Sequence, residues 1–383
     1  MSTRSSTEPI LDHGYWMTEA IELARDAMAL AHPNPRVGAV VVNDGILVGR
    51  GFHAFDRLDH AEIVALDQAG PKAAGASLYV NLEPCSHTGR TGPCTKAIIA
   101  AGVKKVYAAM KDPNPLVSGR GFAELRHAGI EVHIGIYEPY AKETNEDFAK
   151  WIRTQLPFVT LKAALTLDGQ IAQRAGRTTA ISGPASRQLV QHLRHRADAL
   201  LTGIGTILAD DPLLTDRSKK PRRRRLLRAV VDSRLRLPLR SQLVRSARHD
   251  VLVFTTRSVE SPKARALARA GVEVFRAPGR AGRVDLREVI RELGRRQMLN
   301  VLLEAGAALN GSALEAGLVD KLVLFYAPRI MGAGGVPLAQ VPSRWFAKSP
   351  PLSNVTLERC EPDFVVEGYF HDVYRDHRRR GKN

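Results

Sequence analysis

Two of the chain's three cysteines lie in one short stretch, EPCSHTGRTGPC, which runs from Glu83 to Cys94. A second stretch upstream, His60-Ala61-Glu62, adds a histidine and a carboxylate. One histidine and two cysteines can hold a zinc ion in a tetrahedral site whose fourth position stays open. We therefore expect a fold that brings His60, Cys85 and Cys94 together around zinc.

The surroundings of these residues suit catalysis. Each ligand stands at or just before a predicted helix start, where the helix dipole stabilises a thiolate. Zinc lowers the pKa of a bound water from about 9 to about 7. Glu62 could then carry a proton from that water to a leaving amine. The order H-x-E, P-C and a later cysteine is typical of zinc-dependent nucleobase deaminases, although eight residues separate the cysteines here instead of two.

Helix and strand patterns alternate along the first part of the chain, which predicts an α/β layered domain. We expect helices over 15–31, 60–69, 93–102 and 122–128. Asp59 is the expected cap of the second helix, and Pro93 the expected first residue of the third. Strands are expected over 37–42, 77–82, 105–109 and 131–136. The pattern pauses over 151–157, and we place the domain boundary there, between residues 156 and 157.

The second part alternates as well. Strands are expected over 158–164, 199–202, 228–231, 250–255, 300–303 and 322–326, and helices over 186–196, 264–270, 286–295 and 312–316. Residues Gly306–Gly311 follow a predicted strand and open a predicted helix, which is a natural cradle for a phosphate. The pattern G-x-G-x-x-G is absent, so an ordinary strand–helix turn is an equally good interpretation.

Charge is distributed unevenly between the two parts. The net charge is +17, of which residues 1–157 contribute −2 and residues 158–383 contribute +19. A basic domain favours a polyphosphate ligand or a nucleic acid. The basic stretches 217–228 and 375–383 are expected to be a solvated loop and a frayed end.

Other features narrow the class of protein. No run of about 18 apolar residues predicts a membrane span, and the first residues lack the apolar core of a signal peptide. Three cysteines do not suffice for a disulfide framework in a chain of this length. We therefore expect a cytoplasmic protein with free thiols.

Longer motifs resemble one family, the bifunctional deaminase/reductases of riboflavin biosynthesis. The deaminase half is similar in HPNPRVG over 32–38, in both zinc stretches, in DPNP over 112–115 and in GRG over 119–121. The reductase half is similar in TLDGQIA over 166–172, ADDPLLT over 209–215, VDS over 231–233 and EAG over 304–306. The resemblance implies an α/β protein: a cytidine-deaminase-like α/β/α domain over residues 1–156, then a dihydrofolate-reductase-like α/β domain over 157–383.

The resemblance also implies roles for individual residues. His60, Cys85 and Cys94 would bind zinc, and Glu62 would be the proton shuttle. The deaminase substrate pocket would be lined by Asn34, His53, His87 and Arg90. NADPH would contact Ala164, Ala180, Thr206, Asp210, Ser233, Gly306, Ala307, Ala308, Leu309, Asn310, Gly311 and Ser312. The reductase substrate would contact Thr178, Arg194, Leu214, Arg217 and Glu304, where the two arginines suit a phosphate because guanidinium binds it bidentately. Some relatives carry Trp in place of Ala180.

The implied reactions act on one small phosphorylated pyrimidine. The first is zinc-dependent hydrolytic deamination of 2,5-diamino-6-ribosylamino-4(3H)-pyrimidinone 5′-phosphate. The second is NADPH-dependent reduction of its ribosyl side chain to ribityl. We expect a homo-oligomer that binds neither membranes nor nucleic acid.

Two alternatives stay open at this point. A zinc-dependent tRNA deaminase with a basic accessory domain is favoured by the net charge but not by the cysteine spacing. A zinc-stabilised binding module without activity would normally have four protein ligands, and three are visible.

Overall fold

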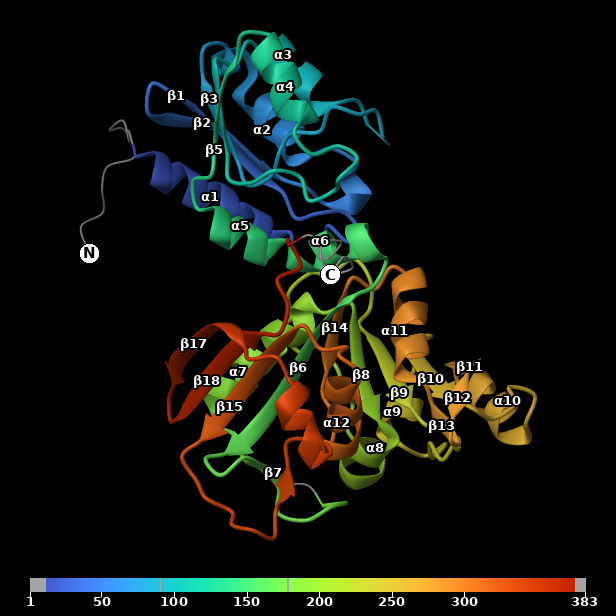
Figure 1. Cartoon of the computed structure of the whole chain (residues 1–383). Coiled ribbons are helices and arrows are strands. Elements are labelled where there is room, and N and C mark those ends of the chain that lie inside the picture. Colours follow the sequence, from blue (N-terminus) through green and yellow to red (C-terminus); the bar gives the residue numbers. More distant parts are fainter. Residues whose placement is uncertain (1–11, 90, 178, 376–383) are drawn as a thin grey trace, which may run out of the picture. The chain divides into compact units, whose positions relative to one another are not determined.

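The computed structural model describes residues 12–89, 91–177 and 179–375. The chain divides into two compact units, Met1–Thr154 and Gln155–Asn383, and each is a mixed α/β structure (Figure 1). This division lies two residues before the boundary that the sequence suggests. No helix in the described part of the chain is long and apolar enough to cross a membrane.

The first unit is built on a five-stranded sheet in the order β2-β1-β3-β4-β5. Its strands are β1 (Gly38–Asn43), β2 (Ile46–Phe52), β3 (Ser77–Val80), β4 (Lys105–Ala108) and β5 (Glu131–Ile134). Strand β1 runs antiparallel to β2 and β3, whereas β3, β4 and β5 are parallel. The expected strands in this unit are confirmed, with β2 as an addition.

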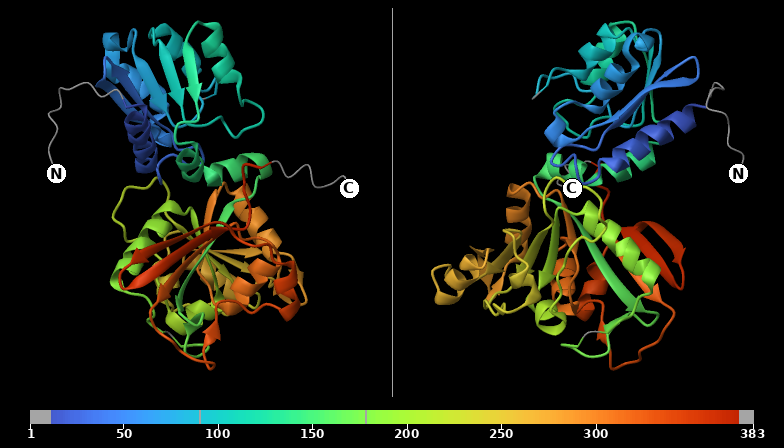
Figure 2. Two further views of the ribbon diagram at one scale, coloured as in Figure 1. Left: turned by 60° about the vertical axis from the view of Figure 1, so that its left-hand side comes forward. Right: turned by 180° about the vertical axis from the view of Figure 1, so that it is seen from behind.

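Helices cover both faces of this sheet. They are α1 (His13–Asp26), α2 (Ala61–Ala69), α3 (Cys94–Ala100), α4 (Arg120–His127), α5 (Glu138–Thr144) and α6 (Glu146–Thr154), with short 3₁₀ turns at η1 (Phe55–Arg57) and η2 (Gly70–Ala73). Helices α1 and α5 pack together on one face, and α2, α3 and α4 on the other (Figures 1 and 2). The expected α/β/α layering is therefore present.

Several local predictions for this unit are wrong in detail. Helix α1 ends at Asp26 instead of residue 31, with Ala27 as its C-cap. His60, not Asp59, is the N-cap of α2, and Pro93 is the N-cap of α3 instead of its first residue. Helix α6 occupies part of the stretch 151–157, where the sequence pattern pauses.

The missed strand β2 has a tertiary explanation. Two glycines weaken its strand signal, yet both are required by the packing of α2. A Cβ atom at Gly49 would lie 2.0 Å from the Ala65 carbonyl oxygen, and one at Gly51 would lie 2.7 Å from the Ala61 carbonyl oxygen. Close approach of the helix, not the strand itself, selects glycine there.

The second unit contains a nine-stranded sheet in the order β11-β10-β9-β8-β14-β6-β15-β18-β17. These strands are β6 (Phe158–Thr166), β8 (Ala199–Gly203), β9 (Leu227–Val231), β10 (Val251–Thr255), β11 (Val272–Arg276), β14 (Asn300–Leu303), β15 (Lys321–Ala327), β17 (Ser353–Cys360) and β18 (Asp363–Tyr369). The strands from β11 to β15 are parallel, and β18 and β17 complete the sheet as antiparallel strands. The six expected strands are all confirmed.

The remaining elements surround this sheet. Helices are α7 (Pro184–Arg196), α8 (Ile204–Asp210), α9 (Gln242–Arg245), α10 (Pro262–Arg269), α11 (Leu286–Arg295) and α12 (Ala307–Glu315), with a 3₁₀ segment η3 (Ser343–Lys348). Two-stranded ribbons are formed by β7 (Gln170–Ala172) with β16 (Val336–Pro337), and by β12 (Gly279–Arg280) with β13 (Arg283–Val284). Helix α12 begins five residues earlier than expected, so most of the run from Gly306 is helical.

The strand order places a topological switch point between β8 and β14. From β8 the chain continues to β9 on one side, whereas from β14 it continues to β15 on the other. Ligands of open α/β sheets bind at the carboxyl ends of strands that diverge in this way. The candidate ligand edge of this unit is therefore where β8, β14 and β6 end.

Candidate active sites

His60, Cys85 and Cys94 come together in the first unit. Their ligand atoms all lie within 4.8 Å of one another. His60 Nδ1 is 3.1 Å from Cys94 Sγ and 3.4 Å from Cys85 Sγ. His60 caps α2, Cys94 opens α3, and Cys85 lies in the loop after β3. Two helix N-termini therefore meet at the cluster.

The electrostatics of the cluster fit a zinc ion. Hydrogen bonding with the Cys94 thiol and with His60 lowers the pKa of Cys85 to about 4, so a thiolate is available at neutral pH. The backbone N–H of Cys94 also donates to Cys85 Sγ, over 3.3 Å. Among the described residues the cluster supplies three ligands, which leaves the fourth position of a tetrahedral site open.

Glu62 lies in the first turn of α2 and is only 3% exposed. Burial raises its pKa to about 6, although the neighbouring His60 opposes the shift. A carboxyl group that titrates close to neutral pH can accept and release a proton under the same conditions.

Asn34 and His53 lie against the metal cluster. The Asn34 side-chain nitrogen is 3.0 Å from His53 Nε2, and the other ring nitrogen of His53 is 2.8 Å from the Asp59 carbonyl oxygen. The rings of His53 and His60 meet edge to face, with 5.2 Å between centroids. The structure thus brings two of the four expected pocket residues beside a zinc ligand.

The loop that carries Asn34 is fixed by a buried ion pair. Arg36 is 0% exposed, and its guanidinium binds both carboxylate oxygens of Asp147, over 2.9 and 2.5 Å. Its backbone N–H donates to Asn145, and its carbonyl oxygen accepts from Asn81 and Asn145. Most of the HPNPRVG motif is therefore a clamp that holds Asn34 in place.

A second clamp lies beside Cys85. The buried Glu83 carboxylate accepts hydrogen bonds from the backbone N–H groups of Asp112, Gly119 and Gly121, over 3.1, 2.9 and 2.9 Å. A Cβ atom at Gly121 would lie 2.0 Å from the Pro84 carbonyl oxygen. The DPNP and GRG motifs thus contact Glu83 and Pro84, the two residues directly before the candidate zinc ligand Cys85.

The two other expected pocket residues, His87 and Arg90, follow Cys85 in the sequence. His87 is exposed, and Arg90 lies outside the described residues. Asp112, which sequence reasoning did not select as a site residue, is near His87: burial raises its pKa to about 6, and His87 opposes the shift.

Several expected ligand residues of the second unit gather at the switch-point edge. Thr206 lies in the first turn of α8, directly after β8, and Ser233 follows β9 by two residues. Glu304 and Gly306 follow β14, and Ala164 lies near the end of β6. These residues come from four neighbouring strands, as a ligand laid across the sheet edge would require.

The turn before α12 is open on its ligand side. A Cβ atom at Gly306 would meet nothing within 4 Å, and the same holds at Gly205 in α8. By contrast, the Asn310 side chain donates to the Ala305 and Leu338 carbonyl oxygens, and Gly311 packs on the Gln340 backbone. The glycine run therefore divides into an open turn and a buried, structural part.

The other expected residues of this unit occupy varied positions. Asp210 is exposed at the end of α8, Leu214 is buried, and Arg217 is exposed. The remaining expected cofactor contacts lie along α12: Ala307, Ala308, Leu309 and Ser312. Thr178 lies outside the described residues.

A charged cluster occupies the end of β14. Arg194 donates to both oxygens of Glu304, over 2.8 and 3.0 Å, and to the Thr215 carbonyl oxygen over 3.1 Å. Lys162 Nζ on β6 lies 3.8 Å from the same carboxylate. Burial opposes ionisation of Glu304, but the two cations outweigh it and hold its pKa below the usual range. Lys162 was not selected as a site residue from the sequence, although the stretch Leu161-Lys162 resembles the reductase half of the family.

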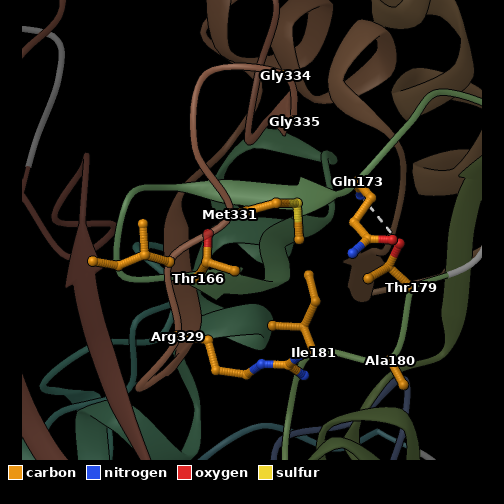
Figure 3. A pocket seen from close by; sticks show the side chains of 10 residues that line it. Thr166, Gln173, Thr179, Ala180, Ile181, Arg329, Met331, Gly334 and Gly335 are labelled. Atoms are coloured by element: carbon orange, nitrogen blue, oxygen red, sulfur yellow. Dashed lines mark hydrogen bonds between the residues drawn. The ribbon is translucent and has the colours of Figure 1, made fainter.

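A pocket of about 250 Å³ opens at the ends of β6 and β15. It is lined by Thr166, Gln173, Thr179, Ala180, Ile181, Arg329, Ile330, Met331, Gly334 and Gly335. Figure 3 shows the Arg329 side chain extending toward Ile181, below Met331. The Asp168 carboxylate holds one wall by accepting from the Met331 and Gly332 N–H groups. The expected cofactor contact Ala180 is thus part of a real cavity.

Comparisons with known proteins cover both units. The family model for the cytidine and deoxycytidylate deaminase zinc-binding region matches residues 11–110, and the model for the RibD C-terminal domain matches residues 157–366. The chain is 40% identical over 356 residues to the riboflavin biosynthesis protein RibD of Aquifex aeolicus, covering 93% of this chain and 98% of that protein. It is 39% identical to that of Escherichia coli, covering 92% and 98%.

Solved structures of related proteins also match the chain over both units. RibD of Acinetobacter baumannii superposes with a TM-score of 0.82 at 38% identity, covering 93% of this chain and 98% of that chain. A diaminohydroxyphosphoribosylaminopyrimidine deaminase/5-amino-6-(5-phosphoribosylamino)uracil reductase from Thermotoga maritima gives 0.79 at 34% identity, with the same coverage. These matches confirm the expected fold class, a cytidine-deaminase-like domain followed by a dihydrofolate-reductase-like domain.

Proposed function

The chain belongs to the RibD family of riboflavin biosynthesis proteins, and from this premise we propose that its units carry a zinc-dependent pyrimidine deaminase and an NADPH-dependent reductase. The substrate is the phosphorylated diaminopyrimidinone ribosylamine that the sequence resemblance implies. The observation that supports this proposal best is the cluster of His60, Cys85 and Cys94 with Glu62 buried beside it.

In the deaminase, the three ligands would hold zinc, which activates water for attack on the ring carbon that bears the 2-amino group. Glu62 is placed to take the proton released by that water and to deliver it to the departing amine, so that ammonia leaves. Asn34 and His53 would orient the pyrimidine beside the metal, because Asn34 contacts His53 and His53 contacts His60. Roles for His87 and Arg90 stay predictions from the family.

In the reductase, the open turn at Gly306 and the N-terminus of α12 suit the cofactor's pyrophosphate. Thr206, Ser233 and Ala164 would contact the rest of NADPH, which supplies hydride to C1′ of the ribosyl group. Glu304 and Lys162 lie at the next strand ends, where they can hydrogen-bond the substrate. Arg194 already binds Glu304 through two of its nitrogens, so Arg217 is the freer of the two expected phosphate ligands.

Two further predictions belong to this proposal. A reducing compartment such as the cytoplasm is required, because the zinc thiolates must not pair with each other. A homo-oligomer stays a prediction. The tRNA deaminase alternative rests on net charge alone, whereas the family matches span both units.

The test is a mass spectrum of products from the purified chain, the phosphorylated diaminopyrimidinone and NADPH. Deamination raises the substrate mass by about one unit and reduction by about two more. We expect a gain of about three with the wild-type chain. A Glu62→Gln variant should retain zinc and lose deamination.

A Cys94→Ser variant is the matched control, since it should lose zinc and deamination together. Normal turnover by Glu62→Gln would remove Glu62 from the mechanism. An unchanged substrate mass with wild-type protein that contains zinc would overturn the proposed function.

A further inference from the structure

The loop between α8 and β9 carries a concentration of positive charge that the proposed function does not explain. Residues 217–225, here called the basic loop, read RSKKPRRRR and contain seven cations and no acidic residue. Lys219, Lys220 and Arg225 are exposed. The sequence predicts only a solvated loop at this position.

The base of the loop is fixed, so its charges have a defined location. Arg222 donates to Asp216 over 3.0 Å and to the Ala197 carbonyl oxygen over 2.8 Å, at the end of α7. His195 on α7 lies 3.0 Å from the same Asp216 carboxylate. The backbone N–H of Arg217 donates to Gln191 over 2.9 Å. Arg222 therefore serves as an anchor that caps α7, while the exposed cations project from a held loop.

The residues that lead into the basic loop contact the charged cluster of the reductase site. The guanidinium of Arg194 binds the Glu304 carboxylate and, through its other terminal nitrogen, the Thr215 carbonyl oxygen. Thr215 is two residues from the first residue of the basic loop. The Arg194 side chain thus links the cluster at the end of β14 to a residue just before the loop, and Arg222 of the loop donates to the Arg194 carbonyl oxygen over 3.4 Å.

We propose that the basic loop is a phosphate-collecting element of the reductase, which attracts the 5′-phosphate of the substrate to the site through Lys219, Lys220 and Arg225. This inference rests on the proposed function for the identity of the substrate. The chemistry recognised is a phosphate monoester dianion, which the 2′-phosphate of NADPH also carries. The substrate is favoured because the loop includes Arg217, the freer of the two expected phosphate ligands of the substrate.

Long-range attraction of this kind has a predictable size. A phosphate dianion gains attraction from all three cations, and this gain is screened over about 10 Å at 0.1 M ionic strength and about 30 Å at 0.01 M. Removing the three charges should raise the substrate KM several-fold at 0.01 M ionic strength and by a smaller factor at 0.1 M. The kcat should stay unchanged, because the attraction acts equally on bound substrate and transition state.

The test compares the full-length wild-type chain with a Lys219→Gln/Lys220→Gln/Arg225→Gln variant. A matched control removes three charges elsewhere in the same unit, at Lys263 and Arg269 on α10 and Arg287 on α11. Steady-state reductase kinetics are measured from 0.01 to 0.3 M salt with phosphorylated and with phosphatase-treated substrate. Calorimetric titration with ribose 5-phosphate, without cofactor, gives a readout independent of turnover. A Lys219→Gln/Lys220→Gln variant guards against a folding defect in the triple variant.

We expect a weaker salt dependence, a higher KM and weaker ribose 5-phosphate binding in both loop variants only, with no effect on phosphatase-treated substrate. Equal behaviour of loop and control variants would overturn the inference while leaving the proposed function intact. If the loop variants raise the KM for NADPH but not the KM for NADH or for the substrate, the loop recognises the 2′-phosphate of the cofactor. That result would overturn the assignment to the substrate. Salt-sensitive RNA binding lost in the loop variants, with unchanged reductase kinetics, would also overturn it. An inactive wild-type chain that still binds ribose 5-phosphate through the loop would instead count against the proposed function.

Discussion

Replacing Asp147 by Asn should unfold the first unit at a markedly lower temperature. The side chains of Arg36 and Asp147 are 1% and 0% exposed. The guanidinium directs its donors at two carboxylate oxygens, at the Met28 and Thr144 carbonyl oxygens, and at His32 Nε2. The Asn side chain removes the only negative charge in this set and turns an NH₂ group toward the guanidinium.

The magnitude follows from the burial of the pair. Breaking a buried ion pair by removing one partner costs about 3–5 kcal/mol, because the remaining charge is left uncompensated. For a unit of this size, that corresponds to a fall in Tm of roughly 10 °C or more. Deaminase activity should fall as well, since Arg36 holds the loop that carries Asn34, while reductase activity should persist.

Differential scanning calorimetry of the full chain measures this effect, and urea unfolding followed by tryptophan fluorescence supports it. Glu22→Gln is the matched control, because it breaks an exposed pair with Arg25 whose side chains are 56% and 38% exposed. An exposed pair contributes about 0–1 kcal/mol. If Asp147→Asn destabilises the chain no more than Glu22→Gln does, the clamp interpretation is refuted.

Three other outcomes are expected. Gly121→Ala should weaken zinc retention and deamination, because its Cβ atom would lie 2.0 Å from the Pro84 carbonyl oxygen. Gly89→Ala is the control and should be neutral, because a Cβ atom there meets nothing within 4 Å. Equal zinc content in the two variants would contradict this prediction. The pKa of Glu304 is held below its usual value of about 4.5 by its two cations despite burial, so its stabilising effect should be complete at pH 7 and disappear as pH falls through the folded pKa. Urea titrations of wild type and Glu304→Gln from pH 7 to pH 3 test this, and a difference independent of pH would speak against it. Ala180→Trp should lower the KM for NADPH about two- to tenfold by adding a ring contact in the pocket of Figure 3. An unchanged KM would show that the cofactor does not reach that pocket.

Much of the organisation was accessible from local sequence. Strands such as β14 and helices such as α11 are marked by runs of apolar residues with the period of the element, and their observed bounds equal the expected ones. The candidate zinc ligands were accessible because cysteine is rare in this chain and the chemistry of zinc restricts its ligands to few residue types. Glu62 followed from its separation of two residues from His60.

The rest depended on contacts between residues distant in the sequence. Arg36 and Asp147 are 111 residues apart, and Arg194 and Glu304 are 110 apart, so no local pattern announces either pair. Strand β2 was missed because its glycines are required by the close packing of α2 on the strand. Strand propensity does not take such packing into account.

Sequence by itself therefore determined the two α/β halves, the zinc donor set and the uneven charge. Each of these depends on residue type and short-range spacing. Only the tertiary structure decided that HPNPRVG is mostly a clamp, that the expected phosphate ligand Arg194 is already paired, and that part of a basic stretch anchors α7. The physical reason is that the role of a charged side chain depends on its partner, and the fold selects that partner from anywhere in the chain.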